Sequence, residues 1–88
     1  MSDIADGGPR VVLVVRQGCH LCDEARDVVR RVAAETGSTW TEVDVDADAQ
    51  LLQGYSDQVP VVLVDGRQHD FWRVDEQRLR AALSGHGR

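Results

Sequence analysis

Lysine is absent from this sequence of 88 residues, so all ten basic residues are arginines, and fifteen acidic residues give a net charge of −5. This excess of acid argues against binding to the phosphate backbone of nucleic acids, which requires clustered Lys and Arg. No apolar run approaches the roughly 20 residues needed to cross a membrane. We therefore expect neither a nucleic-acid partner nor a membrane partner.

Cysteine is scarce as well: there are two, too few for a disulfide-rich secreted scaffold. Residues 1–8 have neither the basic nor the apolar region of a signal peptide. We therefore expect a cytoplasmic monomer. Its length allows a single domain, which we place at residues 10–84 between flexible tails at 1–9 and 85–88. In a reducing cytoplasm an adjacent cysteine pair is more often catalytic or metal-binding than structural.

The two cysteines, Cys19 and Cys22, lie three positions apart, between a predicted strand and a predicted helix. The first turn of a helix has unpaired N–H groups and a partial positive charge, which favour a thiolate over a thiol. A thiolate attacks disulfides, and a second cysteine one turn later can resolve the mixed disulfide. Such a pair inside a βαβ pattern is typical of thiol–disulfide redox proteins.

Other uses of the cysteine pair remain open: a zinc half-site, a structural disulfide or two inert thiols. Zinc needs four ligands, and only the histidines at positions 20, 69 and 86 could complete the set. The main hypothesis is therefore a small dithiol oxidoreductase. The alternative is a non-catalytic module that carries a metal or cluster, or senses redox state.

Hydrophobic periodicity predicts an α/β domain with the element order βαβαββα. Continuous apolar runs predict two central strands, at Val11–Val15 and Val59–Val64. Alternation of polar and apolar residues predicts an edge strand at Trp40–Val45. Asp65-Gly66 predicts a hairpin that leads into a second edge strand, Arg67–Trp72. The result is a four-stranded mixed sheet with helices on both faces.

Three helices complete the prediction. The first begins at Cys19 or His20, carries Cys22 on its buried stripe and ends at Gly37. A short second helix is expected within residues 46–55, with a stop at Gly54. The last runs from Val74 to Leu83, with Asp75 as a candidate N-cap.

With these motifs in place, residues 10–84 resemble the thioredoxin fold at glutaredoxin size, and most of all the small bacterial glutaredoxin-like proteins with a Cys-x-Leu-Cys motif. The features that carry the resemblance are Cys19-His20-Leu21-Cys22, Val59-Pro60 and the Asp65-Gly66 hairpin. It implies that Cys19 is the nucleophile and that Cys22 resolves. It also implies that Pro60 is cis and that Val59 and Pro60 contact the substrate.

The resemblance further implies a protein that works through its Cys19–Cys22 disulfide without a separate cofactor. The partner would be a disulfide-containing protein, or glutathione or another low-molecular-weight thiol, with a flavin reductase as a possible electron donor. Glutaredoxins usually have a Gly-Gly pair before the last helix that contacts glutathione. This chain has Phe71-Trp72-Arg73-Val74 there, so we expect thiol–disulfide chemistry more firmly than a glutathione partner.

Two side chains near the motif are candidates for tuning the reactivity of the cysteine pair. His20 could stabilise the Cys19 thiolate and make the disulfide more oxidising, and Arg16 could do the same or simply be a solvated charge. We interpret Phe71 and Trp72 as core or edge packing rather than as a substrate platform. The aspartates at positions 44, 46 and 48 are explained by strand and helix-cap positions without a metal.

Overall fold

The computed structural model describes residues 9–84. Apart from Pro9, the tails predicted at 1–9 and 85–88 lie outside the described residues, as does His86. The elements follow in the order β1 (Val11–Val15), α2 (His20–Thr36), β2 (Trp40–Asp44), the 3₁₀ helix η1 (Val45–Ala47), α3 (Ala49–Tyr55), β3 (Val61–Val64), β4 (Arg67–Phe71) and α4 (Glu76–Ser84). This order confirms the predicted βαβαββα pattern, with η1 as an unpredicted addition.

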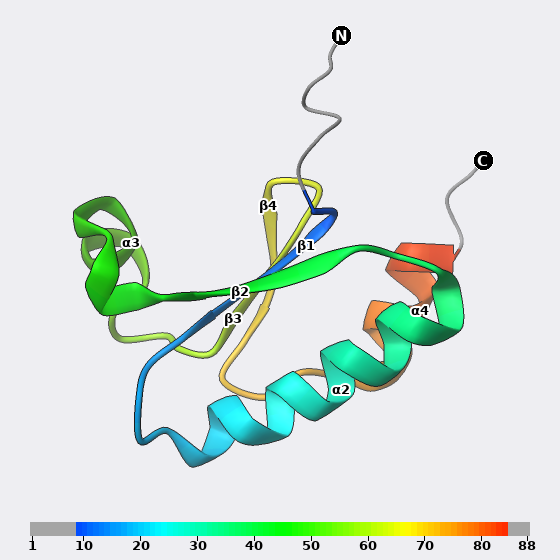
Figure 1. Ribbon diagram of the computed structural model, residues 1–88, viewed down its shortest axis with the longest axis horizontal. Coiled ribbons are helices and arrows are strands. Elements are labelled where there is room, and N and C mark those ends of the chain that lie inside the picture. Colours follow the sequence, from blue (N-terminus) through cyan, green and yellow to red (C-terminus); the bar gives the residue numbers. More distant parts are fainter. Residues whose placement is uncertain (1–8, 85–88) are drawn as a thin grey trace, which may run out of the picture.

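The four strands form one mixed sheet in the order β2-β1-β3-β4 (Figure 1). β1 runs parallel to β2 and antiparallel to β3, and β4 pairs antiparallel with β3. The two continuous apolar segments are therefore the central strands, as predicted. The parallel β1–β2 pair requires the long crossover that α2 supplies.

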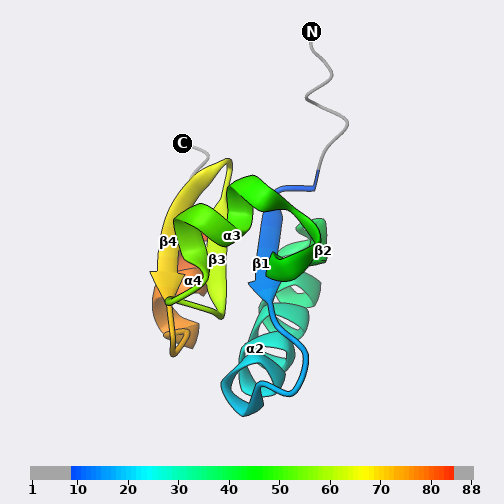
Figure 2. The same cartoon turned by 90° about the vertical axis from the view of Figure 1, so that its left-hand side faces the viewer.

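Helices cover both faces of the sheet, and the alternation of side chains along β1 supplies both cores. Val11, Leu13 and Val15 face α2 and α4, which lie side by side (Figure 1). Val14 faces the other way, toward η1 and the short α3, which stands in front of the strands in Figure 2. The larger of the two buried clusters lies on the α2–α4 face.

Local backbone chemistry sets the ends of the elements. The Asp65-Gly66 turn has positive φ values of 53° and 84°, which is the geometry of a tight hairpin turn. Gly37 ends α2 in the left-handed conformation, and its N–H donates to the carbonyl of Ala33. These two predicted turns are confirmed.

Several predicted boundaries are wrong. β4 ends at Phe71 and not at Trp72, and α4 spans Glu76–Ser84 instead of Val74–Leu83. β2 ends at Asp44, because Val45 begins η1 and is buried there. The short helix α3 passes through Gly54 and ends at Tyr55, so this glycine does not stop it. β3 begins at Val61, one residue after Pro60, whose nitrogen has no hydrogen to donate to a ladder.

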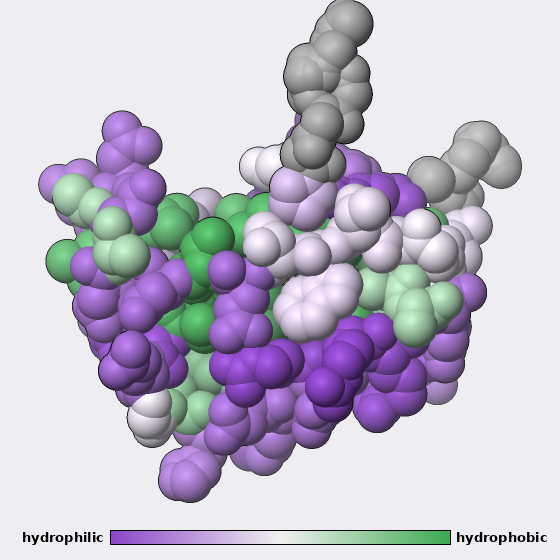
Figure 3. All heavy atoms as spheres, in the orientation of Figure 1, coloured by the Kyte–Doolittle hydropathy of each residue, from purple (hydrophilic) through white to green (hydrophobic). Residues whose placement is uncertain are grey.

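Charged residues gather on the outside of the molecule. Figure 3 shows hydrophilic residues along the outer side of α2, with apolar surface between α3 and the sheet. Among the described residues, no helix is long and apolar enough to cross a membrane.

Candidate functional site

Cys19 and Cys22 are joined in a disulfide at the start of α2, with their Cα atoms 5.2 Å apart. Cys19 is the N-cap of the helix, and its Sγ accepts a hydrogen bond from the backbone N–H of Cys22 at 3.1 Å. Its backbone carbonyl accepts from the N–H of Asp23 at 3.3 Å. The sulfur of Cys19 thus occupies the position where Ser or Asp usually caps a helix.

The two sulfurs have different surroundings. Cys22 is 1% exposed and belongs to the core beneath α2, whereas Cys19 is only partly buried. A helix N-terminus stabilises negative charge, and the Cys22 N–H points at the Cys19 sulfur. Cys19 is therefore the more accessible of the two cysteines, and it lies where the start of the helix favours negative charge.

Val59 and Pro60 directly precede β3. The Val59–Pro60 peptide bond is cis, Pro60 is fully buried, and Val59 packs against the same core cluster as Cys19. Among the described residues, neither the backbone N–H nor the C=O of Val59 takes part in a backbone hydrogen bond, although the neighbouring Gln58 and Pro60 carbonyls both accept from Trp72. Val59 therefore carries an unused donor and acceptor.

Arg16 is held by partners other than the cysteines. Its guanidinium donates to both carboxylate oxygens of Asp46, each at 3.2 Å, and to the carbonyl of Ser56 at 3.3 Å. The hydrogen bond to Asp46 raises the pKa of Arg16. Asp46 largely offsets this charge, so any influence of Arg16 on the cysteines acts together with that of Asp46.

The histidines are dispersed. His20 is exposed at the first position of α2, between the cysteines in sequence. His69 lies partly buried on β4, where burial and then the nearby charge of Arg78 lower its pKa, and its Nε2 has no hydrogen-bond partner. Within residues 9–84, no three His, Cys, Asp or Glu side chains are grouped closely enough to hold a metal ion.

The aspartates that follow β2 form caps and an ion pair. Asp44 accepts from the N–H of Asp46, and Asp48 accepts from the N–H groups of Gln50 and Leu51. This agrees with the interpretation of these residues as cap positions.

Phe71 and Trp72 correct the core part of our interpretation of them as core or edge packing, because neither lies in the core. They are 40% and 53% exposed, and their rings meet edge to face with centroids 5.1 Å apart. The physical reason is the backbone at Trp72, which turns into the left-handed region with φ 63° and carries the chain off the edge strand. Both rings therefore project from the sheet instead of lying beneath it.

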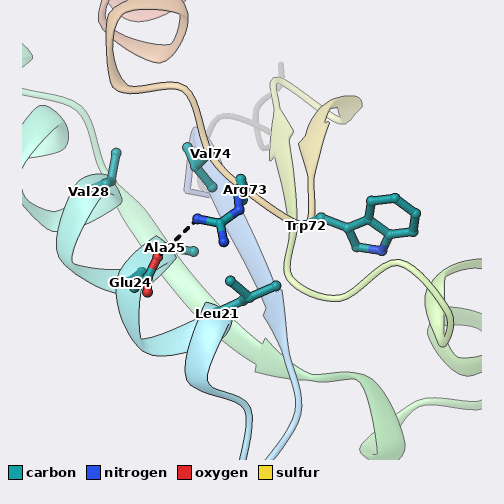
Figure 4. A pocket seen from close by; sticks show the side chains of 7 residues that line it. All are labelled: Leu21, Glu24, Ala25, Val28, Trp72, Arg73 and Val74. Atoms are coloured by element: carbon teal, nitrogen blue, oxygen red, sulfur yellow. Dashed lines mark ion pairs between the residues drawn. The ribbon is translucent and has the colours of Figure 1, made fainter.

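The chain after β4 forms a hollow with the start of α2. Leu21, Glu24, Ala25 and Val28 line it from α2, and residues 72–74 line it from the other side (Figure 4). Arg73 reaches across toward Glu24, with 3.8 Å between Nη1 and Oε1. A second, more open groove of about 450 Å³ adjoins it, lined by Leu21, Val59, Phe71, Trp72 and Arg73. The resemblance placed Phe71, Trp72 and Arg73 where glutaredoxins contact glutathione, but the sequence did not predict that Leu21 joins them in one groove.

A four-stranded mixed sheet with helices on both faces, and a Cys-x-x-Cys disulfide at the start of the first helix, define a thioredoxin-fold protein of glutaredoxin size. Residues 10–84 match the family model of the glutaredoxin-like domain (DUF836). The chain belongs to this glutaredoxin-like family.

Individual relatives agree with this assignment. The uncharacterized protein Rv0508 of Mycobacterium tuberculosis is 38% identical over 81 residues, which cover 86% of this chain and 84% of that protein. The X-ray structure of protein XcR50 from X. campestris is 36% identical, covers 85% of this chain and 96% of its own, and gives a TM-score of 0.69. A mutant thioredoxin from Halobacterium salinarum is 26% identical, with a TM-score of 0.62 over 91% of this chain and 77% of its own.

Proposed function

We propose that the protein is a small thiol–disulfide oxidoreductase that works through Cys19 and Cys22. The observation that carries the proposal is the asymmetry of the pair: a partly exposed sulfur at the helix N-cap, bonded to a buried one. The family and the similarity to a thioredoxin support it.

The proposed reaction is a two-step exchange. The Cys19 thiolate attacks one sulfur of a substrate disulfide, forms a mixed disulfide and releases the other sulfur as a thiolate. The Cys22 thiolate then attacks the Cys19 sulfur, which releases the substrate thiolate and forms the Cys19–Cys22 disulfide. Two electrons pass to the substrate. A low-molecular-weight thiol or a flavin reductase returns two electrons and two protons to the pair, and no further cofactor takes part.

The neighbouring residues have proposed roles in this exchange. Val59 offers its unpaired backbone groups to the substrate chain beside Pro60. His20, exposed next to Cys19 in sequence, stabilises the attacking thiolate and makes the disulfide more oxidising. Arg16 tunes the same thiolate through its ion pair with Asp46. The proposed place of action is the cytoplasm, where a reductant keeps the pair cycling.

The test is reduction of a model disulfide peptide with dithiothreitol as the electron source. We expect Cys19→Ser to abolish the protein-dependent rate, and Cys22→Ser to accumulate a mixed disulfide visible by mass spectrometry. Unchanged activity in Cys19→Ser would refute the assignment. Stoichiometric zinc or iron in protein purified without oxygen would favour a metal-carrying module instead.

A further inference from the structure

We propose that the groove lined by Leu21, Phe71 and Trp72, here called the aromatic groove, selects disulfides in polypeptides. Its occupant is an extended segment of a partner protein whose residue next to the reacting cysteine is large and apolar. The inference rests on the proposed function, since it names the substrate class of that same site. The proposal also implies that the protein reacts faster with such polypeptides than with mixed disulfides of glutathione.

The first argument is position. Leu21, which lies between the two cysteines in sequence, lines the groove, and so does Val59, which packs against the same core cluster as Cys19. A volume of about 450 Å³ leaves room for a large side chain together with part of its backbone. A polypeptide whose cysteine meets Cys19 therefore brings its neighbouring residue to this groove.

The second argument is exposure. Among the described residues, the large hydrophobic side chains that remain exposed are Leu52, Phe71 and Trp72, and the last two line this groove. Single exposed apolar side chains are common and need no explanation. Two adjacent aromatic rings that line one groove with Leu21 are different, because aromatic side chains dominate the energetics of binding surfaces.

The third argument is backbone strain at Trp72. A left-handed φ of 63° costs a residue with a Cβ atom about 1–2 kcal/mol. The conformation is held by two hydrogen bonds, from the Trp72 N–H to the Pro60 carbonyl at 2.8 Å and from the indole Nε1–H to the Asp57 carbonyl at 3.1 Å. A bulky residue kept where glycine would fit freely indicates that its ring has a use.

The fourth argument is charge, which separates the two substrate classes. Glutathione carries two carboxylates, which need cations or free N–H groups. At the start of α4, two of the N–H groups, those of Asp75 and Arg78, already donate to the carboxylates of Asp70 and Asp75, each at 3.0 Å, which leaves fewer donors there for a carboxylate. Arg73, the cation of the groove, faces Glu24. An apolar side chain needs neither a cation nor a free N–H group.

The fifth argument is the backbone of Val59. Its N–H and C=O take part in no backbone hydrogen bond of the described residues, and Val59 lines the groove. A partner in extended conformation can pair with such groups, as in strand addition, while its side chain fills the adjoining groove. The groove and Val59 together therefore fit an extended polypeptide with a large apolar side chain.

The test uses pre-reduced protein in single turnover with three chromogenic mixed disulfides of thionitrobenzoate. Two are hexapeptides that differ only in having Phe or Gly before the cysteine, and the third is glutathione. We expect the Phe peptide to react about tenfold faster than the Gly peptide and than glutathione, as expected for one well-packed aromatic contact. In Trp72→Ala and Phe71→Ala, the ratio of the Phe to the Gly peptide should fall to near one.

Leu52→Ala is the matched control, because Leu52 is 39% exposed on α3 but does not line the groove; it should keep the tenfold ratio. Phe71→Ala serves as the second variant if Trp72→Ala fails to fold. Equal rates for all three substrates in the wild type, or an unchanged ratio in both groove variants, would overturn the proposal and leave the oxidoreductase function standing. If no substrate reacts faster than with Cys19→Ser, the proposed function itself fails.

Discussion

Replacing Trp72 by glycine and by alanine should reverse the usual order of stability of these two residues. In ordinary positions Gly is about 0.5–1 kcal/mol less stable than Ala, because it loses more chain entropy on folding. At the φ of 63° that Trp72 adopts, Ala keeps the left-handed cost of about 1–2 kcal/mol and Gly avoids it. We therefore expect Trp72→Gly to be more stable than Trp72→Ala by about 0.5–1 kcal/mol.

The comparison is clean because both variants lose the same contacts. Each removes the indole, with its 3.1 Å hydrogen bond to Asp57 and its edge contact with Phe71. Those losses, about 1–2 kcal/mol together against the wild type, cancel between the two variants. The difference between the variants thus isolates the backbone conformation at this position.

The assay is urea unfolding of the oxidised protein at fixed pH, with Ala81→Gly as the control. Ala81 is exposed within α4, where glycine should cost about 1 kcal/mol in the ordinary direction. Opposite signs at positions 72 and 81 are the expected result. If Trp72→Ala is as stable as Trp72→Gly or more so, the left-handed backbone, and the strain argument for the aromatic groove, would be refuted.

Three further predictions concern the core, the acid limb and the tuning of the disulfide. Leu79→Ala, at a fully buried position between α4 and the sheet, should cost about 2–5 kcal/mol in urea unfolding, against about 0.5 kcal/mol or less for the exposed Leu52→Ala; equal losses would contradict the assigned core. The hydrogen bond from Arg31 lowers the pKa of Glu76 to about 2 from its ordinary 4.5, so this stabilisation is complete above pH 4.5 and is lost as the pH falls through about 2. Glu76→Gln should accordingly flatten the fall of the urea midpoint between pH 4.5 and 2, and an unchanged slope would speak against the pair. His20→Ala should make the disulfide less oxidising when equilibrated against a glutathione buffer, and an unchanged potential would remove His20 from the tuning residues.

The central part of the fold could be predicted because its signals are local. Apolar runs in β1 and β3, and the Asp65-Gly66 turn between β3 and β4, each determine their own conformation with little help from the rest of the chain. The same holds for Cys19 and Cys22, since the change from strand to helical periodicity places one at the cap and the other on the buried stripe.

The aromatic groove could not be predicted, because it depends on contacts between distant segments. From the sequence, Phe71 and Trp72 are interpreted as core or edge packing between the charged Asp70 and Arg73. The Trp72 N–H donates to the carbonyl of Pro60, twelve positions away, and this contact holds the ring out from the sheet. The backbone at Trp72 is left-handed, which the residue type tryptophan does not predict. A residue pattern predicts whether a side chain tends to be buried. At Trp72 a tertiary contact overrides that tendency.

The effect of Arg16 on the disulfide also depends on a contact with a distant segment. A pair of substitutions tests that effect. The partner that decides its influence, Asp46, lies thirty positions away. If the two act on the Cys19 thiolate by charge, Arg16→Gln leaves an unbalanced anion and should make the disulfide less oxidising. Asp46→Asn leaves an unbalanced cation and should make it more oxidising.

The double variant should then return close to the wild-type potential, because the two charges are removed together. Both side chains are partly exposed, so salt should weaken the single shifts. Potentials measured against a glutathione buffer at low and high salt test this. Shifts of the same sign in both single variants would show that the pair acts by holding the segment before Cys19 against η1, since loss of either partner breaks that contact alike.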